Sequence, residues 1–267
     1  MYRGIRIIFG IMALLLSCSS LQAQEDVEYN WEIGAGVGMM TYTGDFNDRV
    51  LSTKCMSPMA SLILRRTFNP YSHVCTSLSF GGIKVRSMNA DTFYPDYNTG
   101  NYGEAGRSNY EIDNSVIDLS FIYEYNFWPY GTGKEYRGAK RLTPFMAIGL
   151  GFTYGILKDG SYDASEIAYD APAPYGRPDY KPGNPIALNL PIGFGVKYKV
   201  GSRSNLSFSW LCHITTTDKL DGTKDPYRIA SNGLFKNTDC YSTLQVAFTY
   251  SFGPKCSHCM NSDWREY

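Results

Sequence analysis

Several long segments of this sequence alternate between bulky apolar residues and small or polar residues, and the polarity of that alternation restricts the possible folds. In the segment 240–253, one face carries Leu244, Val246, Phe248, Tyr250 and Phe252. The opposite face carries Thr243, Gln245, Ala247, Thr249 and Ser251. A period of two indicates a β-strand, and a water-soluble sheet would bury its bulky face in a core. Here the other face is too small and too polar to build an apolar core, so we predict that the bulky face contacts lipid.

The same pattern recurs along the chain, whereas helical periodicity is hard to find. In 142–157 and 186–200, bulky residues again oppose mainly glycine, alanine, threonine, asparagine and lysine. The candidate strands are 31–42, 56–68, 71–86, 112–127, 142–157, 186–200, 204–217 and 240–253. An even number of strands suits a closed barrel. We therefore predict an all-β fold, an eight-stranded antiparallel transmembrane β-barrel of the small OmpA-like type with long extracellular loops.

The connections between these strands alternate in length. The long ones are 43–55, 87–111, 158–185 and 218–239, whereas Asn69-Pro70 and 201–203 are tight and 128–141 is intermediate. Short periplasmic turns opposite long outer loops are typical of such barrels. Both ends of the barrel domain, 24–253, are then expected in the periplasm, followed by a periplasmic C-terminal tail, 254–267. Proline cannot donate to a ladder, so Pro191 predicts a bulge or a split in its strand.

The first 23 residues are typical of a secretory signal peptide. Arg3 and Arg6 precede an apolar run from Ile7 to Leu16, which is shorter than the roughly 20 residues that span a bilayer. Cleavage is expected after Ala23 or Gln24, and a lipoprotein-like site just before Cys18 is the alternative. The first is favoured, because a lipid anchor adds little to a protein already held by a barrel.

Composition and strand number exclude several functions. The 25 basic residues balance the 25 acidic ones, so no positive field attracts a nucleic acid. The interior of an eight-stranded barrel is filled by side chains, which argues against a diffusion pore. Charged residues on the inner face would then form ion pairs in the lumen: Glu32, Asp118, Glu124, Lys197 and Lys199. Aromatic residues near strand ends could form interfacial girdles: Trp31, Tyr42, Tyr123, Tyr125, Phe127, Trp128 and Tyr130.

Catalysis finds little support among the three histidines. A lipid-modifying barrel needs a base beside a nucleophilic hydroxyl, and His213 with Thr215 or Thr216 is the one candidate pair. Alternation places His213 and Thr215 on the inner face, which favours a structural histidine in the lumen. We predict that the protein is not an enzyme and has no catalytic residues and no cofactor.

The cysteines suggest two further sites. An exported protein can form disulfides, and Cys55 and Cys240 both lie near outer strand ends, so a bond between them is possible. Cys256 and Cys259, with His258 between them, provide half of a tetrahedral metal site that no second motif completes. We predict no metal.

Four motifs occur in an order that resembles a known family. They are WEIGAGVGMMTYTGDFND, LPIGFGVKYKV, TTTDKLDGTKDPY and AFTYSFG, and together they are similar to the PorG-like outer-membrane β-barrel family of Bacteroidetes. Lys219 and Gly222 depart from the residues usual in that family's loop. The family tolerates a proline where Pro191 stands. The family-motif positions are Tyr42, Gly44, Asp45, Phe46, Pro191, Gly193, Gly195, Asp218, Leu220, Asp221 and Tyr227.

The resemblance implies a structural role in the type IX secretion system, where such barrels link the outer membrane to a periplasmic ring. The expected partners are then outer-membrane lipid and periplasmic secretion-ring proteins, contacted by the turn 128–141 and the tail 254–267. The alternative is a surface barrel that binds host ligands or glycans through its outer loops.

Overall fold

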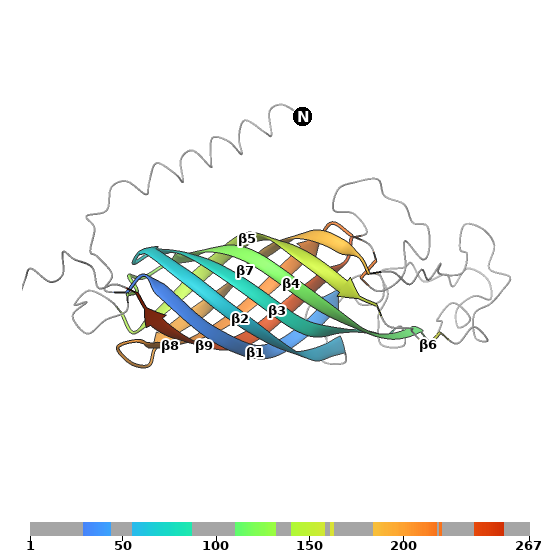
Figure 1. Ribbon diagram of the computed structural model, residues 1–267, viewed down its shortest axis with the longest axis horizontal. Helices are drawn as coiled ribbons and strands as arrows, with labels where there is room; N and C mark the ends of the chain where they lie inside the picture. The colour runs from blue at the N-terminus through green and yellow to red at the C-terminus, as the bar shows by residue number, and fades with distance from the viewer. Residues whose placement is uncertain are drawn as a thin grey trace, which may run out of the picture.

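The computed structural model describes residues 29–43, 55–86, 110–131, 140–157, 161–162, 184–217, 219–220 and 238–253. These form eight long strands and one strand of two residues, arranged as an elongated barrel (Figure 1). The predicted signal peptide and the predicted tail lie outside the described residues. The strands are β1 (Trp31–Thr43), β2 (Met56–Asn69), β3 (Ser72–Arg86), β4 (Tyr110–Asn126), β5 (Leu142–Ile156), β6 (Ser161–Tyr162), β7 (Ile186–Lys199), β8 (Ser204–Thr215) and β9 (Cys240–Phe252).

The barrel closes through antiparallel pairs between chain neighbours and between its first and last strands. The sheet order is β3-β2-β1-β9-β8-β7-β5-β4, and a further pairing of β3 with β4 completes the ring. This confirms the predicted eight-stranded antiparallel barrel. The short β6, which pairs with the start of β4, lies within a segment that the sequence predicts to be a loop. No helix in the described part of the chain has the length and hydropathy to cross a bilayer.

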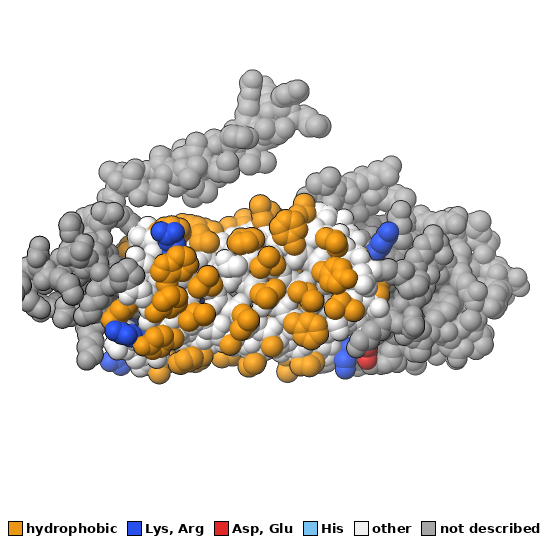
Figure 2. All heavy atoms as spheres, viewed as in Figure 1, with side chains coloured by type: hydrophobic (Ala, Val, Ile, Leu, Met, Phe, Trp, Pro, Cys, Tyr) orange, Lys and Arg blue, Asp and Glu red, His pale blue; other side chains and the backbone are white. Residues whose placement is uncertain are grey.

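The two faces of the strands have the inverted polarity that the sequence predicts. Val37, Leu150 and Ile186 are 68%, 69% and 74% exposed on the outer wall, whereas Ser120 and Thr153 inside are fully buried. Bulky apolar side chains cover the visible wall between the two ends, where the Lys and Arg side chains lie (Figure 2). A continuous apolar band of this kind is unfavourable in water and favourable in hydrocarbon. The chain therefore has the fold and the surface of an outer-membrane β-barrel.

The interior is less uniformly polar than the sequence pattern suggests. One apolar cluster lies toward the end opposite the start of β1: Met40, Tyr42, Met59, Ile83, Val116, Leu220 and Tyr241. A second cluster lies nearer the end where β1 begins: Ile63, Cys75, Ile122, Phe145, Ala147, Leu211 and Ala247. Strands such as β2 also direct Met59 and Ile63 inward between polar residues, so the inner face holds apolar clusters as well as polar layers.

Pro191 causes neither a bulge nor a split, so that prediction was wrong. β7 pairs with β8 without interruption from Asn189 to Lys199. Toward β5 the ladder has a gap around Pro191, yet the register is the same on both sides, Ile148 opposite Ile192 and Gly151 opposite Asn189. Proline removes a donor without adding a residue, so pairing weakens locally while the register holds. The register shift that does occur lies at the end of β2, beside the tight turn to β3.

Four of the aromatic residues predicted to form a girdle face outward, as a girdle requires. Tyr123, Tyr125, Phe127 and Trp128 are exposed on the outer wall near the end where β1 begins. Tyr42 and Tyr130 are buried, so their assignment to a girdle was wrong. In β1 the even-numbered residues face inward, which takes Tyr42 into the lumen, and residue 130 lies beyond the end of β4 and its ring contacts His73.

Candidate functional site

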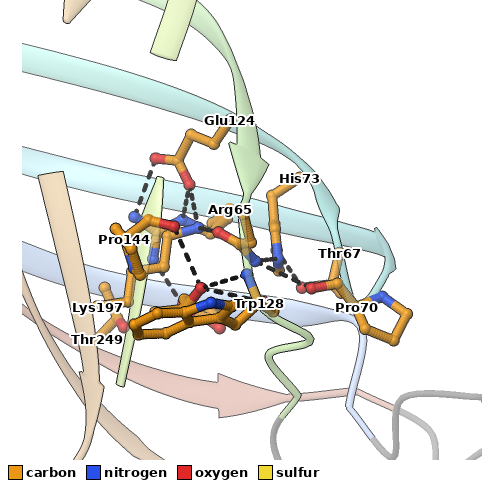
Figure 3. Close-up of polar contacts among 12 residues, drawn as sticks. Arg65, Thr67, Pro70, His73, Glu124, Trp128, Pro144, Lys197 and Thr249 are labelled. Carbon is orange, nitrogen blue, oxygen red and sulfur yellow. Dashed lines mark hydrogen bonds and ion pairs between the residues drawn. The ribbon is translucent and has the colours of Figure 1, made fainter. Parts of the chain in front are cut away.

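A buried network of four charged side chains fills the lumen near the end where β1 begins. Alternation in β2 turns Arg65 inward and its neighbour outward. The Arg65 guanidinium binds Glu32 of β1 at 2.7 Å and Glu124 of β4 through two N–H groups at 2.8 and 3.1 Å (Figure 3). Lys197 of β7 reaches the same Glu124 carboxylate at 2.6 Å. The two cations and two carboxylates balance, so the network carries no net charge.

This network crosses the full width of the barrel. β2 and β7 are four strands apart in either direction around the ring. The route Arg65–Glu124–Lys197 joins them through β4, and all three side chains are almost inaccessible to solvent. Bidentate arginine–carboxylate contacts fix geometry as well as charge. Side chains therefore extend across the lumen from one wall to the other at this level.

Neutral groups hold the network in place. Asn126 accepts a hydrogen bond from the Lys197 ammonium at 3.1 Å, and its amide nitrogen contacts the ring of His73. The other ring nitrogen of His73 lies 2.9 Å from the Thr67 hydroxyl (Figure 3). Thr249 of β9 donates to Glu32 at 3.0 Å. Buried charges are tolerated when their remaining hydrogen-bonding groups find partners in this way.

Gly195, one of the family-motif positions, makes room beside the ammonium of Lys197. A Cβ at position 195 would lie 2.6 Å from the ring of Phe145, closer than real side chains approach. That ring lies 4.7 Å from the Lys197 Nζ, within cation–π distance. The glycine thus allows an aromatic ring to cover the buried cation.

A second polar layer, centred on Asp118, lies toward the opposite end of the barrel. The Tyr241 hydroxyl donates to the Asp118 Oδ2 at 2.8 Å, and Ser120 donates to Oδ1 at 2.7 Å. The Asn189 amide nitrogen also donates to Asp118. β4 and β9, which carry Asp118 and Tyr241, are four strands apart in either direction. This layer therefore spans the diameter as well.

Replacing Tyr241 with phenylalanine is expected to lower the free energy of unfolding by about 1.5 to 3 kcal/mol, the usual range for a hydrogen bond to a charged group. The hydroxyl also lies 2.9 Å from the Thr153 hydroxyl, which would lose a partner. Urea unfolding in phospholipid vesicles measures the loss. Tyr125, exposed on the outer wall, is the matched control, and Tyr125→Phe should change stability by less than about 0.5 kcal/mol. Equal losses in the two variants would contradict the buried layer.

A third layer lies at the end of the barrel opposite the start of β1. Tyr42 donates to the Asp239 carboxylate at 2.6 Å, and the backbone N–H of Leu220 donates to the same carboxylate at 2.7 Å. Asn114 of β4 donates to the Leu220 carbonyl at 2.8 Å. Leu220, which follows β8, is fully buried. Leu220 therefore turns into the mouth of the barrel and is held there by Asp239 and Asn114.

The candidate catalytic pair does not come together. His213 is stacked on the Tyr241 ring at 4.5 Å, and its Nδ1 is 3.9 Å from Asp118. The Thr215 hydroxyl donates to the backbone carbonyls of Asp239 and Thr217 instead. Both side chains are buried in the lumen, as alternation predicts.

The structure describes one of the two predicted cysteine sites, and the other lies outside the described residues. Cys240 carries a free thiol, so the suggested Cys55–Cys240 disulfide is not formed. Cys55 is buried just before β2, whereas Cys240 is only partly buried at the start of β9, opposite Thr43. Within the described residues, no three histidine, cysteine or acidic side chains gather as a metal site. The motif from Cys256 to Cys259 lies outside those residues.

The family-motif positions are divided between two places. Tyr42 and Leu220 meet in the third layer through Asp239. Pro191, Gly193 and Gly195 follow one another on the inner face of β7. The other six lie outside the described residues: Gly44, Asp45, Phe46, Asp218, Asp221 and Tyr227.

The predicted lumen charges all lie on the inner face, as alternation predicts, but one of them is only half-buried. Glu32, Asp118, Glu124 and Lys197 are buried. Lys199 is half-buried, and its ammonium donates to the Gly131 carbonyl at 3.2 Å. Arg65, the centre of the first network, and Asp239, the centre of the third layer, were missed. Alternation within 56–68 could have found Arg65, because it shares a face with Ser61 and Ile63.

Comparisons with known proteins identify one family and several similar solved structures. A family described as "Domain of unknown function (DUF6089)" matches residues 6–261. Among curated proteins, none matches this sequence. Similar solved structures include Neisserial surface protein A (8% identity, 83% of this chain and 97% of that chain, TM-score 0.41) and Ail of Yersinia pestis (10%, 84% and 99%, 0.43). A major outer membrane protein from Thermus thermophilus is a third (12%, 83% and 99%, 0.40). Similarity at this level carries no argument about function.

Proposed function

This chain belongs to the family described as a domain of unknown function, DUF6089, and we propose that it is a non-enzymatic outer-membrane barrel that anchors periplasmic proteins of the type IX secretion machinery. Lipid of the outer membrane would surround its apolar wall. Its periplasmic rim would hold the partner proteins. The PorG-like sequence motifs of Bacteroidetes support this specific role.

The observation that carries the proposal is the lumen spanned by side chains at several levels. The Arg65 network and the Asp118 layer each reach across the barrel between opposite strands, and the third layer gathers Tyr42 and Leu220 around Asp239 at one mouth. Among the residues that the structure describes, side chains span the lumen at these levels, which argues against a solute path, and the Thr215 hydroxyl binds backbone carbonyls rather than His213. What remains available for function is the outer wall and the two rims. An anchoring role uses those surfaces and nothing else.

The periplasmic rim is the end where β1 begins and β9 ends. The turns at this end include the two residues between β2 and β3 and the short connection between β7 and β8. Compact turns offer a firm surface to a partner protein. The turn 128–141 and the tail 254–267 would add to this surface.

The proposal predicts that partners crosslink at one rim and not at the other. A photoreactive amino acid is placed at Ser202, exposed between β7 and β8, and separately at Lys219, exposed after β8. In living cells, we expect the probe at position 202 to capture periplasmic secretion proteins, identified by mass spectrometry. The probe at position 219 is the matched control and should capture none of them.

Two outcomes oppose the anchoring role. Capture of a surface glycan or host protein from position 219, with nothing from position 202, would favour the alternative of a surface barrel that binds ligands through its outer loops. Capture of the same proteins at both positions would indicate non-specific contact. Each variant must first show altered gel migration before boiling, which establishes that the barrel has formed.

A further inference from the structure

The exposed charges at the periplasmic rim are all of one sign among the residues that the structure describes there. Arg66, Lys140, Arg141 and Arg203 are exposed, whereas the carboxylates of this end are turned into the lumen. At the opposite rim the exposed charges are mixed, because Asp113 is exposed as well as Lys219. Figure 2 shows Lys and Arg side chains at both margins of the apolar band and an acidic side chain at only one of them. The described part of the periplasmic rim therefore presents positive charge to its surroundings.

Three of these cations lie against aromatic rings, and we call Arg66, Lys140 and Arg203 the basic collar. The Arg66 guanidinium is 5.3 Å from the rings of both Trp31 and Phe68. The Lys140 ammonium is 4.7 Å from the Trp128 ring. The collar positions lie on β2, before β5 and between β7 and β8, so they are distributed around the barrel.

Arg203 has the closest aromatic contacts of the three. Its guanidinium donates to the Tyr29 hydroxyl at 2.6 Å and to the Tyr250 hydroxyl at 3.3 Å. It also lies 4.5 Å from the Tyr29 ring. These contacts fix the position of the side chain while leaving other guanidinium N–H groups available as donors.

The position of the collar relative to the apolar wall identifies its ligand. Arg66 lies on the same outward face of β2 as Leu64 and Phe68, which are exposed to lipid. Amphipathic aromatic rings settle at the level of lipid headgroups, so a cation stacked on such a ring lies in the phosphate layer. Guanidinium and ammonium groups there attract anionic phospholipids. A soluble acidic partner would approach the rim from the periplasm rather than the side of the wall.

We propose that the basic collar binds the phosphate groups of anionic phospholipids in the periplasmic leaflet of the outer membrane. This inference rests on the proposed outer-membrane location and is independent of any secretion partner. The lipids would form a selected ring around one end of the barrel. They would also fix its depth and orientation in the membrane.

The test uses the full-length protein folded in a neutral detergent and titrated with phosphatidylglycerol or phosphatidylcholine, with bound lipid counted by native mass spectrometry. The wild-type protein should bind phosphatidylglycerol more tightly. The variant Arg66→Gln/Lys140→Gln should lose about 5-fold in phosphatidylglycerol affinity for each cation removed. Its binding of phosphatidylcholine should not change.

The variant Lys84→Gln/Lys219→Gln is the matched control, because it removes two cations from the opposite end of the barrel. Equal losses in both variants, or equal wild-type affinity for the two lipids, would overturn the proposal. Glycerol phosphate is tested as a competitor of phosphatidylglycerol. If millimolar glycerol phosphate displaced the bound lipid as effectively as added phosphatidylglycerol does, the site would bind free phosphate and the proposal would also be overturned. A variant is compared only if its unheated sample migrates differently on a gel from its boiled sample, which shows that the barrel has folded. A negative lipid-binding result would not change the interpretation of the crosslinking experiment, so the two proposals are tested separately.

Discussion

Replacing Arg65 with methionine is expected to lower the free energy of unfolding by about 3 to 5 kcal/mol, the range for breaking a buried ion network. The substitution leaves the carboxylates of Glu32 and Glu124 buried with Lys197 as the remaining cation. Methionine has a similar length, so the loss reports the missing charge more than a cavity. Urea unfolding in phospholipid vesicles, followed by tryptophan fluorescence, measures it.

The adjacent Arg66 provides the matched control for this prediction. It is the same residue type on the same strand, but it faces outward. Arg66→Met should cost less than about 1 kcal/mol, as for an exposed charge. A second change, Glu32→Gln, made in the Arg65→Met background should recover part of the loss, because it removes the carboxylate left without a cation and keeps the Glu124–Lys197 pair. If Arg65→Met and Arg66→Met lose the same stability, the network does not stabilise the barrel.

Placing arginine at position 150 is expected to cost about 2 to 4 kcal/mol in a bilayer, the value for a cation at the midplane of a barrel's lipid face. Leu150 is 69% exposed in the middle of β5. In a protein surrounded by water, an exposed leucine could become arginine at almost no cost. The loss therefore reports hydrocarbon contact directly. The measurement is the same unfolding titration in vesicles.

Leu142→Arg is the control for the depth of the substituted position in the membrane. Leu142 lies on the same face at the start of β5 and is 44% exposed. Leu142→Arg should cost only about 0 to 1 kcal/mol, because this position is near the interface. Similar small losses at positions 142 and 150 would contradict a membrane-spanning wall.

The strands were predictable because each has one face in lipid and one in the lumen, which gives a strong period of two. The predicted bounds agree with the structure to within one or two residues at each end; β4, for example, begins at Tyr110 rather than at residue 112. The inward position of Glu32, Asp118, Glu124 and Lys197 follows from the same alternation.

Which of these charges meet could not be predicted. Alternation gives the face of a residue but not its height in the barrel, which depends on the stagger of all the strands. Arg65 reaches Glu124 across β3, and Lys197 reaches it across β5. In the same way, Tyr42 and Leu220 are far apart in the sequence, and only the closed barrel brings both to Asp239. The family motif gave the residue types without their contacts.

The route from Arg65 through Glu124 to Lys197 has a consequence for biogenesis. With Glu32 of β1, which also binds Arg65, the network draws on β1, β2, β4 and β7, so its charges balance only after strands from both halves of the chain have joined. A partly assembled sheet in the membrane would expose an unpaired cation or carboxylate to hydrocarbon, which is strongly unfavourable. Insertion is therefore expected to be cooperative, with the final seam closing in one step. Half-inserted intermediates should accumulate only when this network is broken.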